Sequence, residues 1–344
     1  MLAVGNEHLT PCLVNPKSAF RNPQFYNYLH DGFILDPMRR IFGIGETVYD
    51  IIFRNRIPQA AKPGGSVLNA IVSLGRAGFP VSFISEYGTD DVGMLIDRFL
   101  RENGVDTSHS YRYSDVNTSL ALAFLDEKND AHYTFHKYYP EKRLDVKLPL
   151  FCKEDILMCG SFFAVGIGIR PQFVKFLEGA SESGALILYD PNFRKSHTSG
   201  LEELLPFIVE NMKLASLVRG SDEDFRNITG AENADEAWKF VSEYCSCLVY
   251  TASSEAVYVR TRSFSGEFPV KKIIPVSTIG AGDNFNAGMV ASIYNNGITK
   301  NILSEMGVAQ WEKIVSAGVD FATNVCLSYD NYISSDLAKM YRIL

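Results

Sequence analysis

The feature that most constrains the fold is a regular alternation of short apolar segments with amphipathic helical patterns, which begins after Met38. Residues 41–45 have the composition of a buried strand, and residues 66–75 place Leu68, Ile71 and Val72 on one helical face. The alternation continues with strands predicted at 81–85, 156–158, 185–189, 216–219, 248–251 and 256–260, and with helices predicted at 94–103, 171–183, 201–212 and 233–245. Alternation at this spacing predicts a three-layer α/β fold, in which helices cover both faces of a mostly parallel sheet.

Two segments differ from this pattern. Residues 118–126 and 132–136 are both strand-like and are separated only by a short polar stretch, so we expect a β-hairpin that interrupts the parallel core. Residues 1–37 contain four of the 14 prolines and no sustained period of either kind. They are predicted to form a loosely packed extension before a single domain at 38–344. The alternative is an arm that covers the domain or a partner subunit.

Composition excludes several classes of function. The chain has 33 Lys and Arg against 40 Asp and Glu, and it has no basic tract, so it is a poor candidate for binding nucleic acid. No apolar run approaches the roughly 18 residues that a membrane span needs. The six cysteines lack the paired spacing of a zinc site, and the first residues lack the pattern of a secretory signal. These observations predict a cytoplasmic protein with reduced cysteines.

The most informative motif lies near the carboxyl end, at residues 274–288. An apolar run, read as a strand, leads into Gly280, Ala281, Gly282 and Asp283, and a helical pattern follows. Glycines free the backbone N–H groups to face a ligand, and a helix N-terminus attracts anions, so the turn suits phosphate oxygens. A carboxylate beside phosphate is explained if Asp283 accepts the proton of an attacking hydroxyl. The alternative is that Asp283 only caps an ordinary helix.

Residues 277–290 resemble the C-terminal signature of the ribokinase-like, or PfkB-type, carbohydrate kinases. The resemblance covers residues 38 to about 331. Residues 64–69 are similar to the Gly-Gly…Asn signature of the sugar pocket, and residues 190–194 resemble a strand end of fructokinase and 2-keto-3-deoxygluconate kinase members. The resemblance implies a ribokinase-like fold with a β lid that includes about 107–140. It also implies ATP-dependent phosphorylation of a hydroxyl on a fructose-like keto-sugar or a sugar acid.

The same resemblance implies roles for individual residues. The sugar would be bound by Asp50, Gly64, Gly65 and Asn69. Phosphoryl transfer would use Asp283 as the base, Arg194 to neutralise charge, and an anion hole formed by the N–H groups of Gly280, Ala281 and Gly282. Each role has a structural alternative: Asp50 as a loop cap after the first strand, Asn69 as a partner of backbone groups, and Arg194 as an exposed strand cap.

The nucleotide site matches the family pattern less closely. The resemblance implies that ATP is bound by Thr251, Ser221 and Asp224, and that Asp224 contributes to Mg²⁺, although it could equally belong to an acidic first helical turn. Ser221 and Asp224 replace the usual Asn and Glu. Residues 251–256 lack both glycines of the family's phosphate loop, and Ser277 replaces an Asp that helps to bind a monovalent cation. Nucleotide preference and potassium dependence therefore stay open.

These departures keep other functions possible. The chain could be a non-catalytic sugar-binding or regulatory member of the family, or a nucleoside kinase with the same fold and base. Because a pure binding protein needs no base, Asp283 and Arg194 favour catalysis. His136 and Lys137, at the end of the hairpin, are further candidates for contact with substrate. The apolar stripe of Leu120, Leu122 and Phe124 could pair two copies of the chain as a homodimer through the lid.

Overall fold

A computed structural model describes residues 39–126, 131–253, 255–270 and 272–342. The predicted extension at 1–37 and the tip of the predicted hairpin lie outside these residues. The chain divides into two units, Met1–Arg39 and Arg40–Leu344, and the fold described below belongs to the second. None of the helices in the described ranges is both long and apolar enough to cross a membrane.

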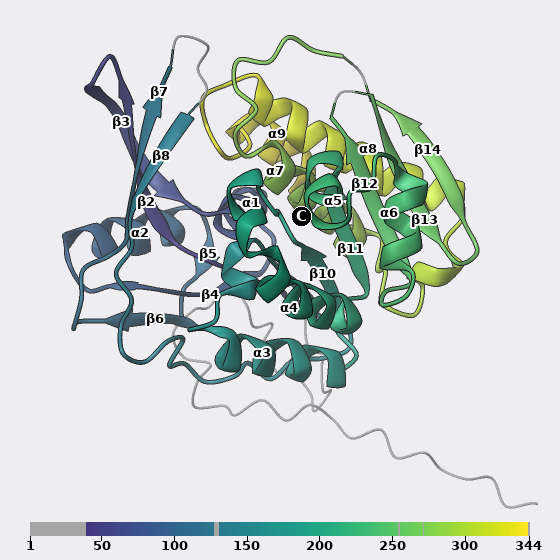
Figure 1. Ribbon diagram of the computed structural model, residues 1–344, viewed down its shortest axis with the longest axis horizontal. Coiled ribbons are helices and arrows are strands. Elements are labelled where there is room, and N and C mark those ends of the chain that lie inside the picture. Colours follow the sequence, from purple (N-terminus) through teal and green to yellow (C-terminus); the bar gives the residue numbers. More distant parts are fainter. Residues whose placement is uncertain (1–38, 127–130, 254, 271, 343–344) are drawn as a thin grey trace, which may run out of the picture. The chain divides into compact units, whose positions relative to one another are not determined.

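A large sheet forms the centre of the second unit (Figure 1). Its strand order is β14 (Ser265–Pro269), β13 (Ala256–Thr261), β12 (Cys247–Ala252), β11 (Leu217–Ser221), β10 (Leu186–Asp190), β9 (Ile156–Gly160), β1 (Ile41–Ile44), β4 (Val81–Gly88) and β5 (Val105–Asp106), with β6 (Ser110–Tyr113) also paired to β4. Only the pairs that involve β13 are antiparallel. The central strands β1, β9 and β10 are buried along their whole length, as expected for a sheet covered on both faces.

Helices cover both faces of this sheet, which confirms the three-layer prediction. One apolar core contains residues of α1 (Ser66–Arg76), α2 (Asp91–Glu102), α7 (Ala281–Asn295), α8 (Val308–Cys326) and α9 (Ser335–Tyr341). The other contains residues of α3 (Arg170–Glu182), α4 (Leu201–Leu214), α5 (Asp222–Thr229) and α6 (Ala234–Val241). Short 3₁₀ turns at η3 (Phe162–Val165), η4 (Lys195–Gly200) and η5 (Leu303–Glu305) complete the connections.

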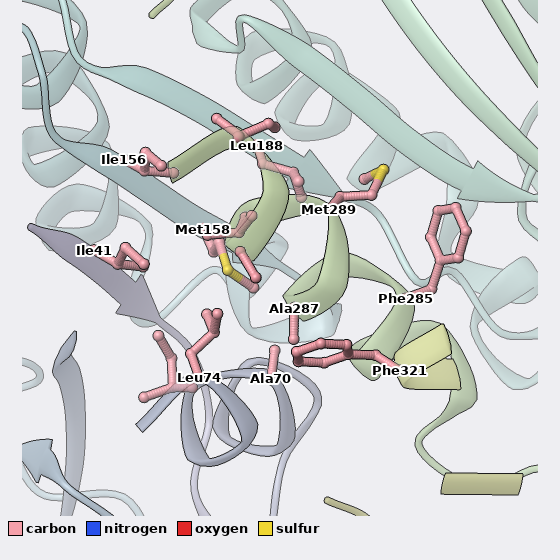
Figure 2. Close-up of a cluster of buried hydrophobic side chains, with 14 of the residues drawn as sticks. Ile41, Ala70, Leu74, Ile156, Met158, Leu188, Phe285, Ala287, Met289 and Phe321 are labelled. Carbon is pink, nitrogen blue, oxygen red and sulfur yellow. The ribbon is translucent and has the colours of Figure 1, made fainter. Parts of the chain in front are cut away.

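The first core sets α1 against α7, which matters for the site. Figure 2 shows Ala70 and Leu74 of α1 near Ala287 of α7, with Phe321 of α8 beside them. These side chains are buried, and Met158 of β9 belongs to the same core. Because small residues lie at the contact, the two helices approach closely and their first turns come together.

The predicted hairpin is confirmed as part of a second, small sheet. Its order is β3 (Ile57–Gly64), β2 (Val48–Arg54), β7 (Leu120–Leu125) and β8 (Ala131–His136). Strands β7 and β8 are antiparallel, as are β2 and β3, whereas β2 runs parallel to β7. Figure 1 shows these four strands as a separate sheet. Two of the four strands come from residues 48–64, outside the range of about 107–140 expected for the lid, and β6 within that range belongs to the main sheet.

The strand predicted at the start of residues 274–288 does not form. This segment is irregular, and it is attached to the end of α8 by a hydrogen bond from the Val276 N–H to the Cys326 carbonyl oxygen at 2.8 Å. The Ile274 side chain is 91% exposed, so the apolar run has no neighbouring strand to cover it. The helix predicted after the glycines is present as α7, but helix α8, to which the segment is attached, was not predicted.

Candidate active site

The Asp283 carboxylate lies in the first turn of α7 and is held by α1. Ser66 Oγ donates to Asp283 Oδ1 at 2.6 Å, and Asn69 Nδ2 donates to Oδ2 at 2.8 Å. Burial raises the pKa of the Asp283 carboxyl, and these two hydrogen bonds oppose the increase. The residue that caps α7 is Gly280, so the alternative in which Asp283 only caps the helix is wrong. In the structure the Asn69 amide donates to Asp283, and not to the backbone groups that its structural alternative would give it.

The backbone before Asp283 forms a tight turn with N–H groups at the helix N-terminus. Gly280 has φ 79°, a left-handed conformation that a side chain would strain. The Ala281 N–H donates to the Thr278 carbonyl oxygen at 3.2 Å. By contrast, the Gly282 N–H has no hydrogen-bond partner among the residues that the structure describes. This turn therefore offers donors for an anion, with the Gly282 N–H already available.

The Asp50 carboxylate comes from the small sheet and not from the main one. Sequence reasoning placed it after a strand of the main sheet, whereas it lies within β2, opposite Lys62 of β3. A Cβ on Gly64 would collide with this carboxylate, so the glycine makes room for it. Burial raises the pKa of Asp50 to about 7, Lys62 lowers it, and Glu46 raises it. The adjacent Gly65 precedes the first residue of α1.

Tyr133, in the small sheet, lies within the electrostatic influence of several candidate site residues. Burial raises the pKa of Tyr133 on β8 to about 12, and the charges of Asp50, Arg194 and Asp283 all act on it. The strand register places Tyr133 on the same face of the small sheet as Asp50, since their partners on β7 are Ala123 and Ala121. Sequence reasoning missed Tyr133, although the alternation of residues 132–136 contains the signal. The charges of Asp50, Arg194 and Asp283 therefore all act on one tyrosine of the small sheet.

The two candidates for substrate contact at the end of the hairpin, His136 and Lys137, lie in different environments. His136 faces the opposite side of the small sheet from Asp50, because its partner on β7 is Leu120 and not Ala121. The register therefore does not place His136 on the face that carries Asp50, and its contact with substrate stays a prediction. Lys137 instead pairs with Glu46, with Nζ 2.7 Å from Oε1.

Arg194 follows β10 and keeps most of its side chain in solvent. Its side chain is 60% exposed, and Nη1 lies 3.8 Å from a carboxylate oxygen of Glu223. Exposed ion pairs at this distance contribute little stability, so the guanidinium can move without large cost. Its charge lowers the pKa of Asp283.

Asp224 completes the capping box of α5, whose N-cap residue is Ser221, and both of its carboxylate oxygens accept hydrogen bonds from the protein. Oδ1 accepts the Phe193 N–H at 2.6 Å, and Oδ2 accepts the Ser221 N–H at 2.7 Å and the Ser221 hydroxyl at 2.6 Å. Burial raises the pKa of Asp224, and the nearby Asp190 carboxylate raises it further. Arg219, which is paired with Asp190, lowers the pKa of Asp224 in turn. Among the described residues no group of three His, Cys, Asp or Glu side chains could hold a metal ion.

Residues 251–256, which lack the glycines of the family's phosphate loop, still contain a residue in the left-handed conformation that glycine favours. Ser253 has φ 45°, in the left-handed region, at the position where the family pattern has its first glycine. The Thr251 hydroxyl accepts a hydrogen bond from Arg219 Nη2 at 2.8 Å. Arg219 lies inside β11, and sequence reasoning did not select it, because a single arginine in an apolar strand gives no clear signal.

Comparisons with known proteins show the family to which this chain belongs. Residues 38–335 match the model of the pfkB family carbohydrate kinases. Fructokinase-1 of Zea mays is 26% identical over 77% of this chain and 80% of its own length. Aminoimidazole riboside kinase of Salmonella typhimurium is 24% identical over 74% and 81%.

Solved structures share the fold. Fructokinase from Vibrio cholerae O395, with fructose, ADP and a calcium ion bound, has a TM-score of 0.75 at 21% identity and covers 88% of this chain and 99% of its own. Aminoimidazole riboside kinase from Salmonella enterica, with the riboside and an ATP analog bound, has a TM-score of 0.75 at 19% identity and the same two coverages. Because the family model matches most of the chain, this protein is a member of the pfkB family of carbohydrate kinases.

Proposed function

We propose that this protein transfers the γ-phosphoryl group of ATP to a hydroxyl of a fructose-like keto-sugar or a sugar acid. The observation that carries the proposal is the Asp283 carboxylate, which Ser66 and Asn69 hold at the start of α7 and whose charge acts, with that of Asp50, on Tyr133. The fructokinases among its relatives and the fructose-bound structural neighbour support a keto-sugar acceptor.

Each group has a separate task in the proposed reaction. The carboxylate of Asp50 accepts hydrogen bonds from sugar hydroxyls, in a pocket bounded by Gly64, Gly65 and Asn69. Asp283 orients the attacking hydroxyl and takes its proton as the new oxygen–phosphorus bond forms. At the same time the bond from the γ-phosphorus to the ADP oxygen breaks, and the proton passes from Asp283 to solvent after the phosphorylated sugar leaves.

Charge on the transferred group is balanced by donors on both sides. The transition state is loose and spreads its charge over the phosphoryl oxygens. The N–H groups of Gly280, Ala281 and Gly282 form the proposed anion hole, and Ala281 exchanges its bond to Thr278 for a phosphoryl oxygen. Arg194 leaves its exposed contact with Glu223 and moves to the same oxygens.

The nucleotide side of the site involves Thr251, Ser221 and Asp224. Mg²⁺, bound with ATP, supplies neutralisation of the phosphate charge. Asp224 would contribute to holding it. The Ser277 hydroxyl accepts a hydrogen bond from the Ile279 N–H at 3.2 Å. Whether a monovalent cation binds at this position is tested by measuring ADP release with and without potassium.

A riboside is the second candidate acceptor, because aminoimidazole riboside kinase is similar to this chain over most of its length. One experiment separates the candidates: coupled ADP release with Mg²⁺ and ATP, using keto-sugars, sugar acids and nucleosides including aminoimidazole riboside. We expect turnover with a keto-sugar or a sugar acid. Turnover with ribosides alone would replace the proposed acceptor class. Silence with every acceptor would favour the non-catalytic, sugar-binding alternative.

We also propose that two copies of the chain associate through the outer face of the small sheet. Leu120, Leu122 and Phe124 lie on the face opposite Asp50, and the Phe124 ring stacks on Phe53 at 4.8 Å. This continuous apolar stripe is only partly covered. Light scattering should give twice the 38.4 kDa chain mass, and Phe124→Glu should halve it. The control Met340→Glu replaces another exposed apolar side chain and should leave the mass unchanged. A monomeric wild type contradicts the proposal.

A cytoplasmic location stays a prediction. The structure describes Cys159, Cys245, Cys247 and Cys326 as free thiols, and burial raises the pKa of all four, which keeps them protonated and unreactive. Imaging of a fluorescent fusion tests the location. A signal confined to another compartment would contradict it.

A further inference from the structure

A buried ion pair lies beneath the first turn of α7. Arg219 on β11 places Nη1 2.9 Å from Oδ2 of Asp190, the last residue of β10, and the two side chains are only 9% and 5% exposed. The loss of hydration of two buried charges roughly cancels their attraction, so such a pair adds little stability compared with apolar side chains of the same size. The pair therefore needs an explanation other than stability.

The ion pair is the centre of a network that joins three strands to one helix. Asp190 Oδ2 also accepts a hydrogen bond from Asn286 Nδ2 at 2.6 Å. Arg219 Nη2 donates to Thr251 Oγ1 on β12 at 2.8 Å. Asn286 lies three residues after Asp283, on the same side of α7. The network thus links the carboxyl ends of β10, β11 and β12 to the turn that carries Asp283.

The guanidinium also lies against the backbone of the proposed anion hole. A Cβ on Gly282 would be 3.0 Å from Arg219 Nη1, and the ring of Phe285 covers the guanidinium at 5.5 Å. Two atoms of the network, Arg219 Nε and Asn286 Oδ1, are buried and have no partner among the described residues. Unpartnered buried polar atoms are costly, so this network is not arranged for stability alone.

We propose that Arg219 is a positioning residue for phosphoryl transfer: through Asp190 and Asn286 it holds the first turn of α7, and with it the Asp283 carboxylate and the Gly282 N–H, against the strand ends of the main sheet. This inference rests on the proposed kinase activity. It assigns Arg219 no contact with substrate or nucleotide. Arg219 acts through the placement of other groups and through the charge that it compensates on Asp190.

The charge on Asp190 gives the proposal a signature that a purely structural residue would lack. The groups that act on Asp283 are Ser66 and Asn69 from α1, Asp190 from β10, Arg194 after β10, and Tyr133 from β8, and among them Asp190 raises the pKa of Asp283. Arg219 neutralises Asp190. Without Arg219 the bare Asp190 carboxylate would raise the pKa of Asp283 further, and the acidic limb of the kcat profile would move to higher pH.

The test compares kcat, KM and pH profile for wild type, Arg219→Met and Arg219→Lys in the full chain, with the acceptor that the wild type phosphorylates. We expect Arg219→Met to lower kcat at least about tenfold, because small misplacements of reacting groups are costly, while KM for the acceptor stays within about twofold. Its acidic limb should move upward. Arg219→Lys should keep the limb in place but lower kcat, because an ammonium cannot bridge Asp190 and Thr251 as a fork.

Two further variants separate positioning from general destabilisation. Arg170→Met is the matched control: Arg170 is equally buried and binds Glu210 and Asn211, in the second apolar core. It should lower the melting temperature similarly but leave kcat per folded molecule and the pH profile unchanged. The double variant Asp190→Asn/Arg219→Met removes both charges and should return the acidic limb towards its wild-type position.

Each outcome decides between the claims. An active wild type whose Arg219→Met and Arg219→Lys variants keep the wild-type kcat and pH profile overturns the positioning role alone. If Arg219→Met does not fold, Arg219→Lys decides: an unchanged kcat, or an acidic limb that moves upward, contradicts the proposal. A wild type that phosphorylates no acceptor overturns the proposed function and this inference with it.

Discussion

At the scale of single residues, the site depends on two carboxyls whose environments differ. Asp50 lies in the small sheet beside Lys62, and burial raises its pKa to about 7. Asp283 is bonded to Ser66 and Asn69, and burial raises its pKa as well. Only the ionised form of Asp50 can accept hydrogen bonds with both oxygens, and only the ionised form of Asp283 can take a proton. Binding and chemistry should therefore respond to pH through different residues.

The first prediction concerns Asp50. Below its pKa of about 7 the carboxyl is protonated, so KM for the acceptor should rise, approaching about tenfold per pH unit. Asp50→Asn should raise KM and remove this dependence on pH, while the kcat profile, set by Asp283, stays in place. Coupled ADP release at several pH values measures both. A wild-type KM that is constant across this range would contradict the assignment.

The same shift has a consequence for stability, with a definite sign. The folded-state pKa of Asp50 is above the ordinary value of 3.8, so between 3.8 and about 7 the folded chain binds more protons than the unfolded chain. The contribution of Asp50 to stability is therefore largest at low pH and declines as pH rises through 7. Thermal melts should show that Asp50→Asn removes this component of the pH slope. A slope that is identical in the variant would contradict the pKa shift.

Sequence reasoning selected the residues that carry a motif and missed those that depend on three-dimensional placement. Asp283, Asn69 and Gly280 stand in recognisable spacings, and the structure puts them within one turn of each other or in direct contact. Tyr133 belongs to the site through the register of β8 against β7, which no short motif specifies. Arg219 is a single charge in an apolar strand, and its partners are distant in sequence.

At the scale of elements, the first turn of α7 depends on Gly280. Its φ of 79° is strained for any other residue, and an added Cβ would lie 3.2 Å from the Asn331 carbonyl oxygen. That oxygen accepts Asn284 Nδ2 at 2.8 Å, and Lys62 of the lid donates to Asn331 Oδ1 at 3.0 Å. Hydrogen bonds through Asn331 therefore join the first turn of α7 to strand β3 of the small sheet.

The second prediction compares two glycines that flank the same helix. Gly280→Ala and Gly297→Ala both place a Cβ at positive φ, with a cost of about 1–2 kcal/mol in unfolding free energy. Nothing lies within 4 Å of a Cβ on Gly297, so that variant should keep the wild-type kcat. Gly280→Ala should lower kcat at least about tenfold, because the anion hole moves. Equal kcat losses in the two variants, measured by ADP release and thermal melts, would contradict this role.

Elements with a clear period were predictable, and those without one were not. Strands β1, β4 and β9 are buried runs, and helices α1 and α3 have apolar residues at helical spacing, so their patterns identified them. Strands β2 and β3 mix polar and apolar side chains because much of the small sheet is exposed. The apolar run before Gly280 resembled a strand, since a segment attached to a neighbouring helix has the same composition as one paired in a sheet.

At the scale of the whole molecule, the strand–helix alternation predicted the architecture but could not give the strand order. The order places β1 between β9 and β4, and pairs the lid strand β2 with β7. These pairings join segments far apart in sequence, and one sequence contains no direct signal for them. The chain divides after Arg39 and the family match begins at residue 38, and a domain start near Met38 stays a prediction.

The third prediction follows from that division. A chain that begins at Met38 should keep its melting temperature within a few degrees and its kcat within about twofold, because the family match starts at residue 38 and the packed core begins at Ile41. Thermal melts and ADP release on the shortened and full chains measure this. Loss of cooperative unfolding in the shortened chain would favour the arm that covers the domain.

The central claim is that Asp283 takes the proton of the acceptor hydroxyl. Its most direct test is kcat of Asp283→Asn against wild type, together with the increase in melting temperature that the acceptor produces in each protein. We predict a loss of about 10²–10⁴-fold in kcat, with the acceptor still raising the melting temperature of the variant. A variant that binds the acceptor and retains kcat within about tenfold of wild type would contradict the account.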